Sequence, residues 1–272
     1  GKKINILEKI EEILKKIPSI KEVIVFPYNS KEKIDFKNFI DFNKSIEESK
    51  LDENFSKHEF NHPIYILYSS GTTGKPKCIT HGAGNVLIEH KKEFMLHCNI
   101  NEEKIFYYTT TGWMMWNWLV GGMSTKSSIY LFDGAPTYPK IDVLLEYCAR
   151  KRINLFGVSA KYIDHLKNEN FNKKKIDLSS VKIIASTGSP LSKESFVYIY
   201  EKIKKDVQLT SIAGGTDLVG CLVLGNLYSN VYEGEIQGQS LGIDVDIFTE
   251  EGKSAEDGTR GELVVKQPFP SM

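Results

Sequence analysis

The 272-residue sequence has no excess charge of either sign and no long apolar run. Thirty-five Lys and Arg residues balance 35 Asp and Glu residues. Because no net field attracts a polyanion, we expect small-molecule partners and no nucleic acid. The longest apolar run, residues 113–123, is shorter than the roughly 20 residues of a membrane-spanning helix, so we expect no membrane association.

Cysteine is scarce, and its spacing excludes two further classes of protein. The four cysteines are far apart and form no CxxC pair or His/Cys cluster, which argues against a zinc site and against a disulfide framework. No signal peptide is visible, so we predict a reduced, cytoplasmic setting. The chain begins without Met and stops soon after a predicted strand, and we interpret both ends as internal to a larger protein.

Hydrophobic periodicity predicts an α/β fold. Isoleucines at helical spacing predict a helix over 6–17, which leads into a strand at 23–26, and the polar segment 29–61 is interpreted as a connection. Beyond it, strands and helices alternate, which predicts layered, parallel-rich sheets flanked by helices. The predicted strands are 64–68, 105–109, 128–132, 155–158, 181–186 and 207–212, and the helices are 84–97, 141–152, 159–168 and 192–204.

The pattern changes after Asp217, where helical periodicity stops. Short β-prone runs separated by Gly-rich turns predict the start of a small β-barrel-like subdomain, with strands at 218–224, 231–236, 243–249 and 261–266. We therefore divide the chain into a first α/β lobe (1–100), a second α/β lobe (101–217) and a partial β-barrel (218–272).

Residues 68–77, YSSGTTGKPK, predict a phosphate-binding loop between a strand and a helix. Glycines let the backbone curl so that several N–H groups converge, while hydroxyls and a lysine add donors and charge. It is not a Walker A loop, because Pro76 follows Lys75 where Ser or Thr is required. A polar turn is the alternative for a bare GTTG. The predicted phosphate ligands are Ser69, Ser70, Gly71, Thr72, Thr73, Gly74 and Lys77.

Two later turns are candidates for further nucleotide contacts. The first, TGSP at 187–190, follows the predicted strand at 181–186, and the second, AGGTD at 213–217, ends the strand at 207–212. A strand-to-helix turn explains the first equally well, and an Asx-type turn explains the second. The three segments become informative together, because they occur in one order and each follows a strand.

In that order and context the segments resemble the adenylate-forming superfamily of acyl-CoA synthetases, luciferases and peptide-synthetase adenylation domains. The resemblance implies that ATP binds here. The loop would hold the β- and γ-phosphates, and Gly188, Ser189 and Pro190 would pack against adenine. Gly214, Gly215 and Thr216 would address the α-phosphate, and Asp217, where most relatives have Glu, would hold Mg²⁺.

Within this superfamily the chain is similar to the acetoacetyl-CoA synthetases almost from end to end. The segments that carry this similarity are 109–118, 156–162, 214–217 and 261–270. It implies that Trp113 lies near the acyl pocket, although a core-facing apolar stretch is the commoner fate of such a Trp/Met cluster. Gly214 stands where acetyl-CoA synthetases carry Trp, and we interpret its missing side chain as room for a longer acid.

The reaction implied is the conversion of acetoacetate, ATP and CoA to acetoacetyl-CoA, AMP and diphosphate through an acyl-adenylate. Lys77, Thr216 and Asp217 are the predicted catalytic residues. The acid is already ionised at neutral pH, so no base is needed and His81 is expected to be structural. The alternatives are a ligase for another short- or medium-chain acid and an inactive nucleotide-binding fragment.

The same resemblance implies two groups that the 272 residues do not show. These are an aspartate that binds the ribose hydroxyls and a lysine on a mobile C-terminal domain. We therefore expect this chain alone to bind ATP weakly and to make no acyl-CoA.

Overall fold

The computed structural model describes residues 6–26, 28, 39–50, 54–69, 74–172 and 175–271. The chain forms two compact units, residues 1–57 and 58–272. The finer division predicted at residues 100 and 217 stays a prediction. Over the described ranges, no helix is both long enough and apolar enough to cross a bilayer.

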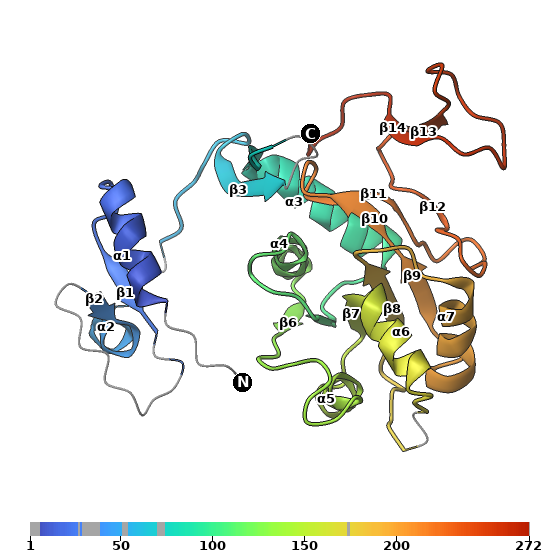
Figure 1. Cartoon of the computed structure of the whole chain (residues 1–272), viewed down its shortest axis with the longest axis horizontal. Helices are drawn as coiled ribbons and strands as arrows, with labels where there is room; N and C mark the ends of the chain where they lie inside the picture. The colour runs from blue at the N-terminus through green and yellow to red at the C-terminus, as the bar shows by residue number, and fades with distance from the viewer. Residues whose placement is uncertain are drawn as a thin grey trace. The chain divides into compact units, whose positions relative to one another are not determined.

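The smaller unit contains two short helices and two short strands (Figure 1). These are α1 (Leu7–Lys16), β1 (Val23–Val25), β2 (Phe39–Asp41) and α2 (Phe42–Glu48). The helix and strand predicted up to residue 26 are confirmed. The interpretation of 29–61 as a plain connection is wrong at β2 and α2. β2 pairs in parallel with β1, and the Asp41 carboxylate caps α2 by accepting a hydrogen bond from Lys44 N at 3.1 Å.

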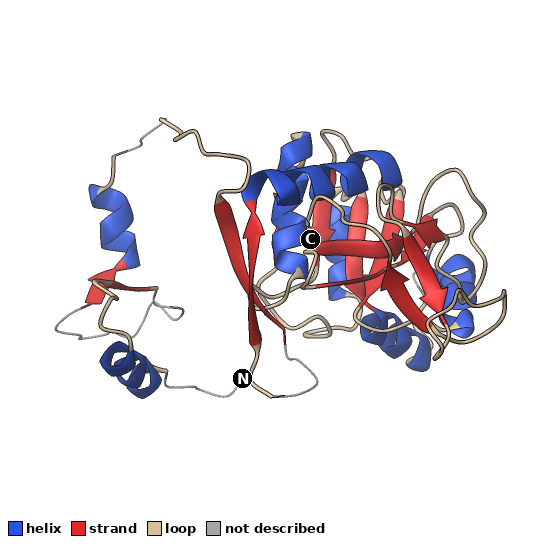
Figure 2. Ribbon diagram, turned by 90° about the horizontal axis from the view of Figure 1, so that it is seen from above, coloured by secondary structure: helices blue, strands red, loops and turns tan. Residues whose placement is uncertain are grey.

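A five-stranded parallel sheet forms the centre of the larger unit (Figure 2). Its order is β6 (Ser128–Tyr130), β5 (Lys104–Tyr107), β7 (Leu155–Ser159), β8 (Ile183–Thr187) and β9 (Gln208–Ser211). Every neighbouring pair is parallel. This arrangement confirms the predicted α/β class.

Two apolar clusters cover the two faces of this sheet, because successive strand side chains point to opposite sides. Phe106 belongs to one cluster, and its neighbours Ile105 and Tyr107 belong to the other. The first cluster includes side chains of α5 (Val143–Lys151), α6 (Ala160–Asn168), α7 (Lys193–Tyr198) and the π-helical turn η3 (Ile199–Ile203). The second includes side chains of the π-helical turn η1 (Glu93–His97), which continues α3 (Ala83–Lys92), and of α4 (Met115–Gly121). A 3₁₀ turn, η2 (Gly122–Thr125), follows α4.

The predicted phosphate loop joins two antiparallel strands, β3 (Pro63–Ser69) and β4 (Lys77–Gly82). The two strands form a long ribbon in Figure 2. The helix predicted after the loop, from residue 84, is confirmed as α3, but the strand β4, which lies between the loop and this helix, was not predicted. Pairing with β3 explains the extra strand: Ser69 stands opposite Lys77, and Leu67 opposite Ile79.

Beyond residue 212 the described chain forms two small antiparallel sheets. One contains β10 (Ala213–Gly215), β11 (Gly220–Leu224) and β12 (Gly238–Gln239), and the other contains β13 (Val245–Phe248) and β14 (Glu262–Val265). The strand predicted at 231–236 is wrong. Its neighbourhood is a loop in which Gln237 Nε2 donates to Ser229 O at 3.0 Å and Glu235 N to Tyr232 O at 3.2 Å.

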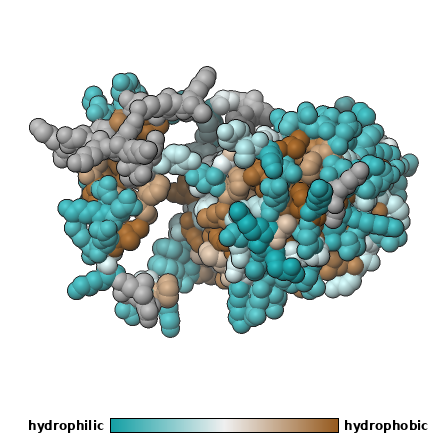
Figure 3. Space-filling model, turned by 90° about the horizontal axis from the view of Figure 1, so that it is seen from below, coloured by the Kyte–Doolittle hydropathy of each residue, from teal (hydrophilic) through white to brown (hydrophobic). Residues whose placement is uncertain are grey.

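Hydrophilic side chains cover much of the face that Figure 3 presents, with apolar side chains between them.

Candidate functional site

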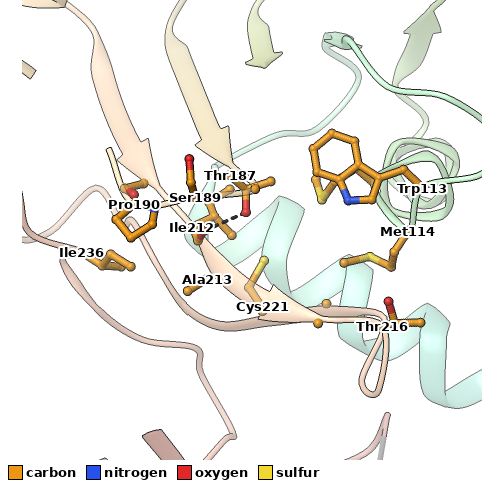
Figure 4. Close-up of a pocket in the computed structure, with 16 residues that line it drawn as sticks. Trp113, Met114, Thr187, Ser189, Pro190, Ile212, Ala213, Thr216, Cys221 and Ile236 are labelled. Carbon is orange, nitrogen blue, oxygen red and sulfur yellow. Dashed lines mark hydrogen bonds between the residues drawn. The ribbon is translucent and has the colours of Figure 1, made fainter. Parts of the chain in front are cut away.

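A pocket of about 360 Å³ lies at the carboxyl ends of β8 and β9 (Figure 4). Ligands of open α/β sheets bind at this edge, because the loops that follow the strands gather there. Among the described residues that line the pocket, none carries a charge. They are Trp113, Met114, Met115, Thr187, Gly188, Ser189, Pro190, Ser211, Ile212, Ala213, Gly214, Gly215, Thr216, Gly220, Cys221 and Ile236.

The turn after β8 forms one wall of the pocket. Thr187 Oγ1 donates to Ile212 O at 2.8 Å, which fixes the end of β8 to the chain that leaves β9. Gly188 has φ +90°, a region that favours glycine, and a Cβ there would lie 3.7 Å from the Trp113 ring. The predicted adenine-side residues Gly188, Ser189 and Pro190 therefore lie together at the pocket, although their contact with a nucleotide stays a prediction.

The β10–β11 hairpin forms the opposite wall and brings in Gly214, Gly215 and Thr216. Gly214 lines the pocket, but the structure gives its glycine a different reason from the one predicted. A Cβ on Gly214 would lie 2.0 Å from Gly220 O and 2.8 Å from Cys221 Cα, on the neighbouring strand. The missing side chain therefore permits close strand pairing, and a larger residue would meet backbone before it reached the pocket.

Asp217, the predicted metal ligand, follows this wall. It is exposed and lies outside the set of residues that line the pocket. Within the described ranges, no group of three or more His, Cys, Asp or Glu side chains is placed to hold a metal ion. A single carboxylate next to Thr216 fits Mg²⁺ that is held mainly by phosphate oxygens and water. Asp217 fits that role better than the role of a member of an all-protein site.

The β3–β4 ribbon brings the phosphate loop to this region. A second cavity of about 450 Å³ is lined by Ser69 of β3 together with Trp113, Met114 and Thr216, so it adjoins the first pocket. Lys77 opens β4 opposite Ser69 and is exposed, and Gly74 has φ +143°. The predicted ligands Ser70, Gly71, Thr72 and Thr73 lie outside the described residues.

The Trp/Met segment divides between pocket and core. Trp113 and Met114 precede α4 and line both cavities, whereas Trp118 and Leu119 within α4 are fully buried. The Trp113 ring stands edge-on to Tyr107, with 6.2 Å between centroids. The core and pocket interpretations of this segment thus apply to different residues, and the nearness of Trp113 to an acyl group stays a prediction.

Sequence reasoning missed a buried polar layer beneath the hairpin. His81 Nε2 donates to Thr216 O at 2.9 Å, and His90 Nε2 donates to Val219 O at 2.7 Å. Val219 is buried and has φ +51°, a strained value for a β-branched residue. His81 is thus structural, as predicted. His81 and His90 thus hold the hairpin backbone in a conformation that Val219 alone would not adopt.

Glu93 lies in the same layer. Burial, followed by repulsion from Glu89, raises the pKa of Glu93 to about 8, while burial lowers the pKa of His90 to about 4. The sequence offered one signal: His90, Glu93 and His97 recur at i, i+3 and i+7, so they share one face of the predicted helix. Spacing alone does not reveal the partners that these residues find on the hairpin and after it, because Val219, Cys221 and Gly225 are 128 or more residues away in sequence.

Comparison with known proteins gives one consistent set of relatives. The family model for the AMP-binding enzyme matches residues 2–272. The acetoacetyl-coenzyme A synthetase of Rhizobium meliloti (strain 1021) is 52% identical over 220 residues, which are 80% of this chain and 34% of that protein. The acetoacetyl-CoA synthetase of Gallus gallus is 42% identical over 282 residues, 99% of this chain and 42% of that protein.

Solved structures of similar proteins agree with the sequence comparison. The acetoacetyl-CoA synthetase of Streptomyces lividans matches all of this chain and 42% of its own, with a TM-score of 0.91 and 34% identity. The anthranilate CoA ligase AuaEII matches 97% of this chain and 49% of its own, with a TM-score of 0.82 at 18% identity, a likeness of fold alone. The chain thus spans between one third and one half of the length of these proteins.

Proposed function

Because the chain belongs to the AMP-binding enzyme family, we propose that it forms the ATP-holding part of an ATP-dependent acid–CoA ligase whose acid is acetoacetate. The proposal rests on one observation: the predicted nucleotide-binding segments meet at one pocket. The turn at 187–190, the hairpin residues 214–216 and Trp113 line one pocket, and Ser69 adjoins it through the second cavity. These segments are separated by up to 147 residues between positions 69 and 216 and are brought together only by the fold.

The roles follow from the chemistry of the groups. Thr216 supplies a hydroxyl and, with Gly214 and Gly215, backbone groups for the α-phosphate, while Gly188, Ser189 and Pro190 pack against adenine. Lys77 and the loop donors neutralise the departing diphosphate. Catalysis then consists of positioning and charge neutralisation, because the acid carboxylate is already a nucleophile. Asp217 would hold Mg²⁺, which supplies further neutralisation of phosphate charge.

The acid is assigned to the side of the pocket formed by Trp113 and Met114. This wall is apolar and the pocket lining is uncharged, which suits a short acyl chain more than a second charged group. In the proposed sequence of steps, the acid carboxylate attacks the α-phosphorus and diphosphate leaves. The CoA thiol then attacks the acyl carbonyl and AMP leaves, so that the thioester replaces the mixed anhydride.

The test measures AMP formation from ATP, Mg²⁺, CoA and a panel of acids by the longest natural chain that contains residues 1–272. We expect acetoacetate to give the highest kcat/KM. Thr216→Val, which removes one hydroxyl, should lower kcat/KM for ATP at least 10-fold, whereas Thr80→Val, at an exposed position of β4, should not. A preference for another acid would overturn the assignment of acetoacetate.

The second candidate, a nucleotide-binding protein without turnover, gives a different result in the same experiment. It would bind ATP, measured by calorimetry, but it would form no AMP with any acid of the panel. The hydrogen-bonded hairpin of residues 213–224 favours the enzyme, because its strained Val219 is held in place by His90.

A further inference from the structure

Glu93 lies directly behind the pocket, where it joins two of its walls. It opens the π-helical turn η1 and its side chain is 0% exposed. Trp118 Nε1 donates to Glu93 Oε2 at 2.6 Å, and Cys221 N donates to Glu93 Oε1 at 2.6 Å. Cys221 Sγ lies a further 3.3 Å from Oε2. One carboxyl group therefore bonds simultaneously to α4 and to β11.

Each of these partners belongs to a wall of the pocket. Trp118 lies in α4, and the cavity is lined by the first residue of that helix, Met115, and by the two residues before it, Trp113 and Met114. Cys221 lines the cavity itself, as does its neighbour Gly220. A Cβ on Gly220 would lie 2.8 Å from Glu89 Cγ and 3.0 Å from Glu93 Oε1, so the hairpin rests directly on the two carboxyl groups.

A lysine completes the cluster around these carboxyl groups. Lys92 Nζ lies 2.7 Å from Glu89 Oε1 and 4.0 Å from Glu93 Oε1, and it donates to Ser240 Oγ at 2.6 Å. Buried charges are tolerated only when they are paired and hydrogen-bonded, so this group of contacts is a built arrangement with one geometry. The raised pKa of Glu93 agrees with a cluster in which Lys92 neutralises one carboxylate and the second carboxyl retains its proton.

Glu93 has no path to reacting atoms. It is absent from the residues that line either cavity, and the proposed adenylation needs no base. An effect on the reaction must therefore pass through Trp118 and Cys221.

We propose that Glu93 is a positioning residue that fixes the separation between α4 and the β10–β11 hairpin, and thereby sets which acid the pocket accepts. The specificity part of this proposal rests on the proposed function, whereas the positioning part does not. It assigns specificity to a residue behind the pocket, in addition to the residues that line it. Trp118 connects Glu93 to the acyl side, and Cys221 connects it to the phosphate side.

The first measurement is the ratio of kcat/KM for acetoacetate to kcat/KM for acetate, in the longest natural chain that contains residues 1–272. This ratio does not depend on the fraction of correctly folded enzyme. We expect Glu93→Gln to change it at least fivefold and Trp118→Phe, which removes the indole N–H, to change it in the same direction. The double variant should change it no more than Glu93→Gln alone, because both substitutions break one link.

The matched control is Glu103→Gln. Glu103 immediately precedes β5 and is paired with Lys182 at 2.6 Å, away from the residues that line the pocket, and its substitution should leave the ratio within a factor of two. A ratio that is equally unchanged in Glu93→Gln and Glu103→Gln overturns the proposal.

The second measurement needs no turnover. Hydrogen exchange of the 272-residue chain should become at least 10-fold faster in Glu93→Gln over 113–121 and 213–224, while β7 (155–159) keeps its protection. Unchanged exchange, or loss of protection spread equally to β7, would overturn the positioning role. If the unmodified protein uses no acid, the proposed function is overturned instead, and the exchange result alone decides whether Glu93 holds the two walls together.

Discussion

At the scale of single residues, Gly214 shows how a residue can be located correctly while a second reason for its identity goes unpredicted. The resemblance to acyl-CoA synthetases located Gly214 at the pocket, and the structure agrees. The predicted role of Gly214, to leave room for a longer acid, concerns only the side of this residue that faces the pocket. The Cβ direction points instead at Gly220 O, on a strand whose pairing with β10 no periodicity in the sequence indicated.

We expect Gly214→Ala to lower the free energy of unfolding by about 1–3 kcal/mol, because the new methyl group would force β10 and β11 apart. Gly238→Ala is the matched control: Gly238 also lies in a strand, β12, and a Cβ there meets no atom within 4 Å. Urea unfolding followed by tryptophan fluorescence measures both variants. Equal free energies of unfolding for the two variants would show that the hairpin accommodates the added methyl group without loss of stability.

At the scale of elements, strongly periodic segments were predicted well and segments stabilised by distant partners were not. Strand β7 and helix α6 lie within two residues of their predicted bounds, because apolar runs and helical periodicity specify them locally. Strand β4 was missed because it exists through pairing with β3. The predicted phosphate loop does follow a strand, β3, but the hairpin that β3 forms with β4 was not predicted.

The turn η1 was included in a predicted helix, yet its polar side chains act as links between elements. His97 is the clearest example. Its Nδ1 donates to Gly225 O at 3.0 Å, and its Nε2 accepts from Leu241 N at 3.0 Å, which fixes the neutral tautomer. One imidazole thus connects η1 to the end of β11 and to the turn after β12.

His97→Ala should therefore lower the free energy of unfolding by about 2–4 kcal/mol, because the buried carbonyl of Gly225 and the part-buried N–H of Leu241 both lose their partner. His165→Ala, at an exposed position of α6, should change it by less than about 0.5 kcal/mol. Thermal and urea unfolding of the two variants give the comparison. A small effect at residue 97 would mean that water replaces the imidazole in both hydrogen bonds.

At the scale of the whole molecule, the buried polar layer makes stability depend on pH in two opposite ways. The folded-state pKa of Glu93, about 8, is above its unfolded value of 4.5, so its contribution is present below pH 4.5 and is lost as the pH rises through 8. The folded-state pKa of His90, about 4, is below its unfolded value of 6.5, so its contribution is present above pH 6.5 and is lost as the pH falls through 4.

Between pH 6.5 and 8 only the Glu93 contribution of this pair changes, and a difference of 1.5 pH units corresponds to about 2 kcal/mol. The buried thiols of Cys98 and Cys221 also have raised pKa values, but their effect begins near pH 9, above this window. We therefore expect stability to decline by about 2 kcal/mol from pH 6.5 to pH 8 and the decline to disappear in Glu93→Gln.

The measurement is urea unfolding at half-unit steps of pH, followed by tryptophan fluorescence. All three tryptophans, Trp113, Trp116 and Trp118, lie in the unit 58–272, so the signal reports the unit that contains the pocket. Glu103→Gln should keep the decline, since its carboxyl is partly exposed and paired with Lys182. Parallel declines in Glu93→Gln and the unmodified protein would mean that Glu93 is already ionised at pH 6.5, with Lys92 as its stable partner.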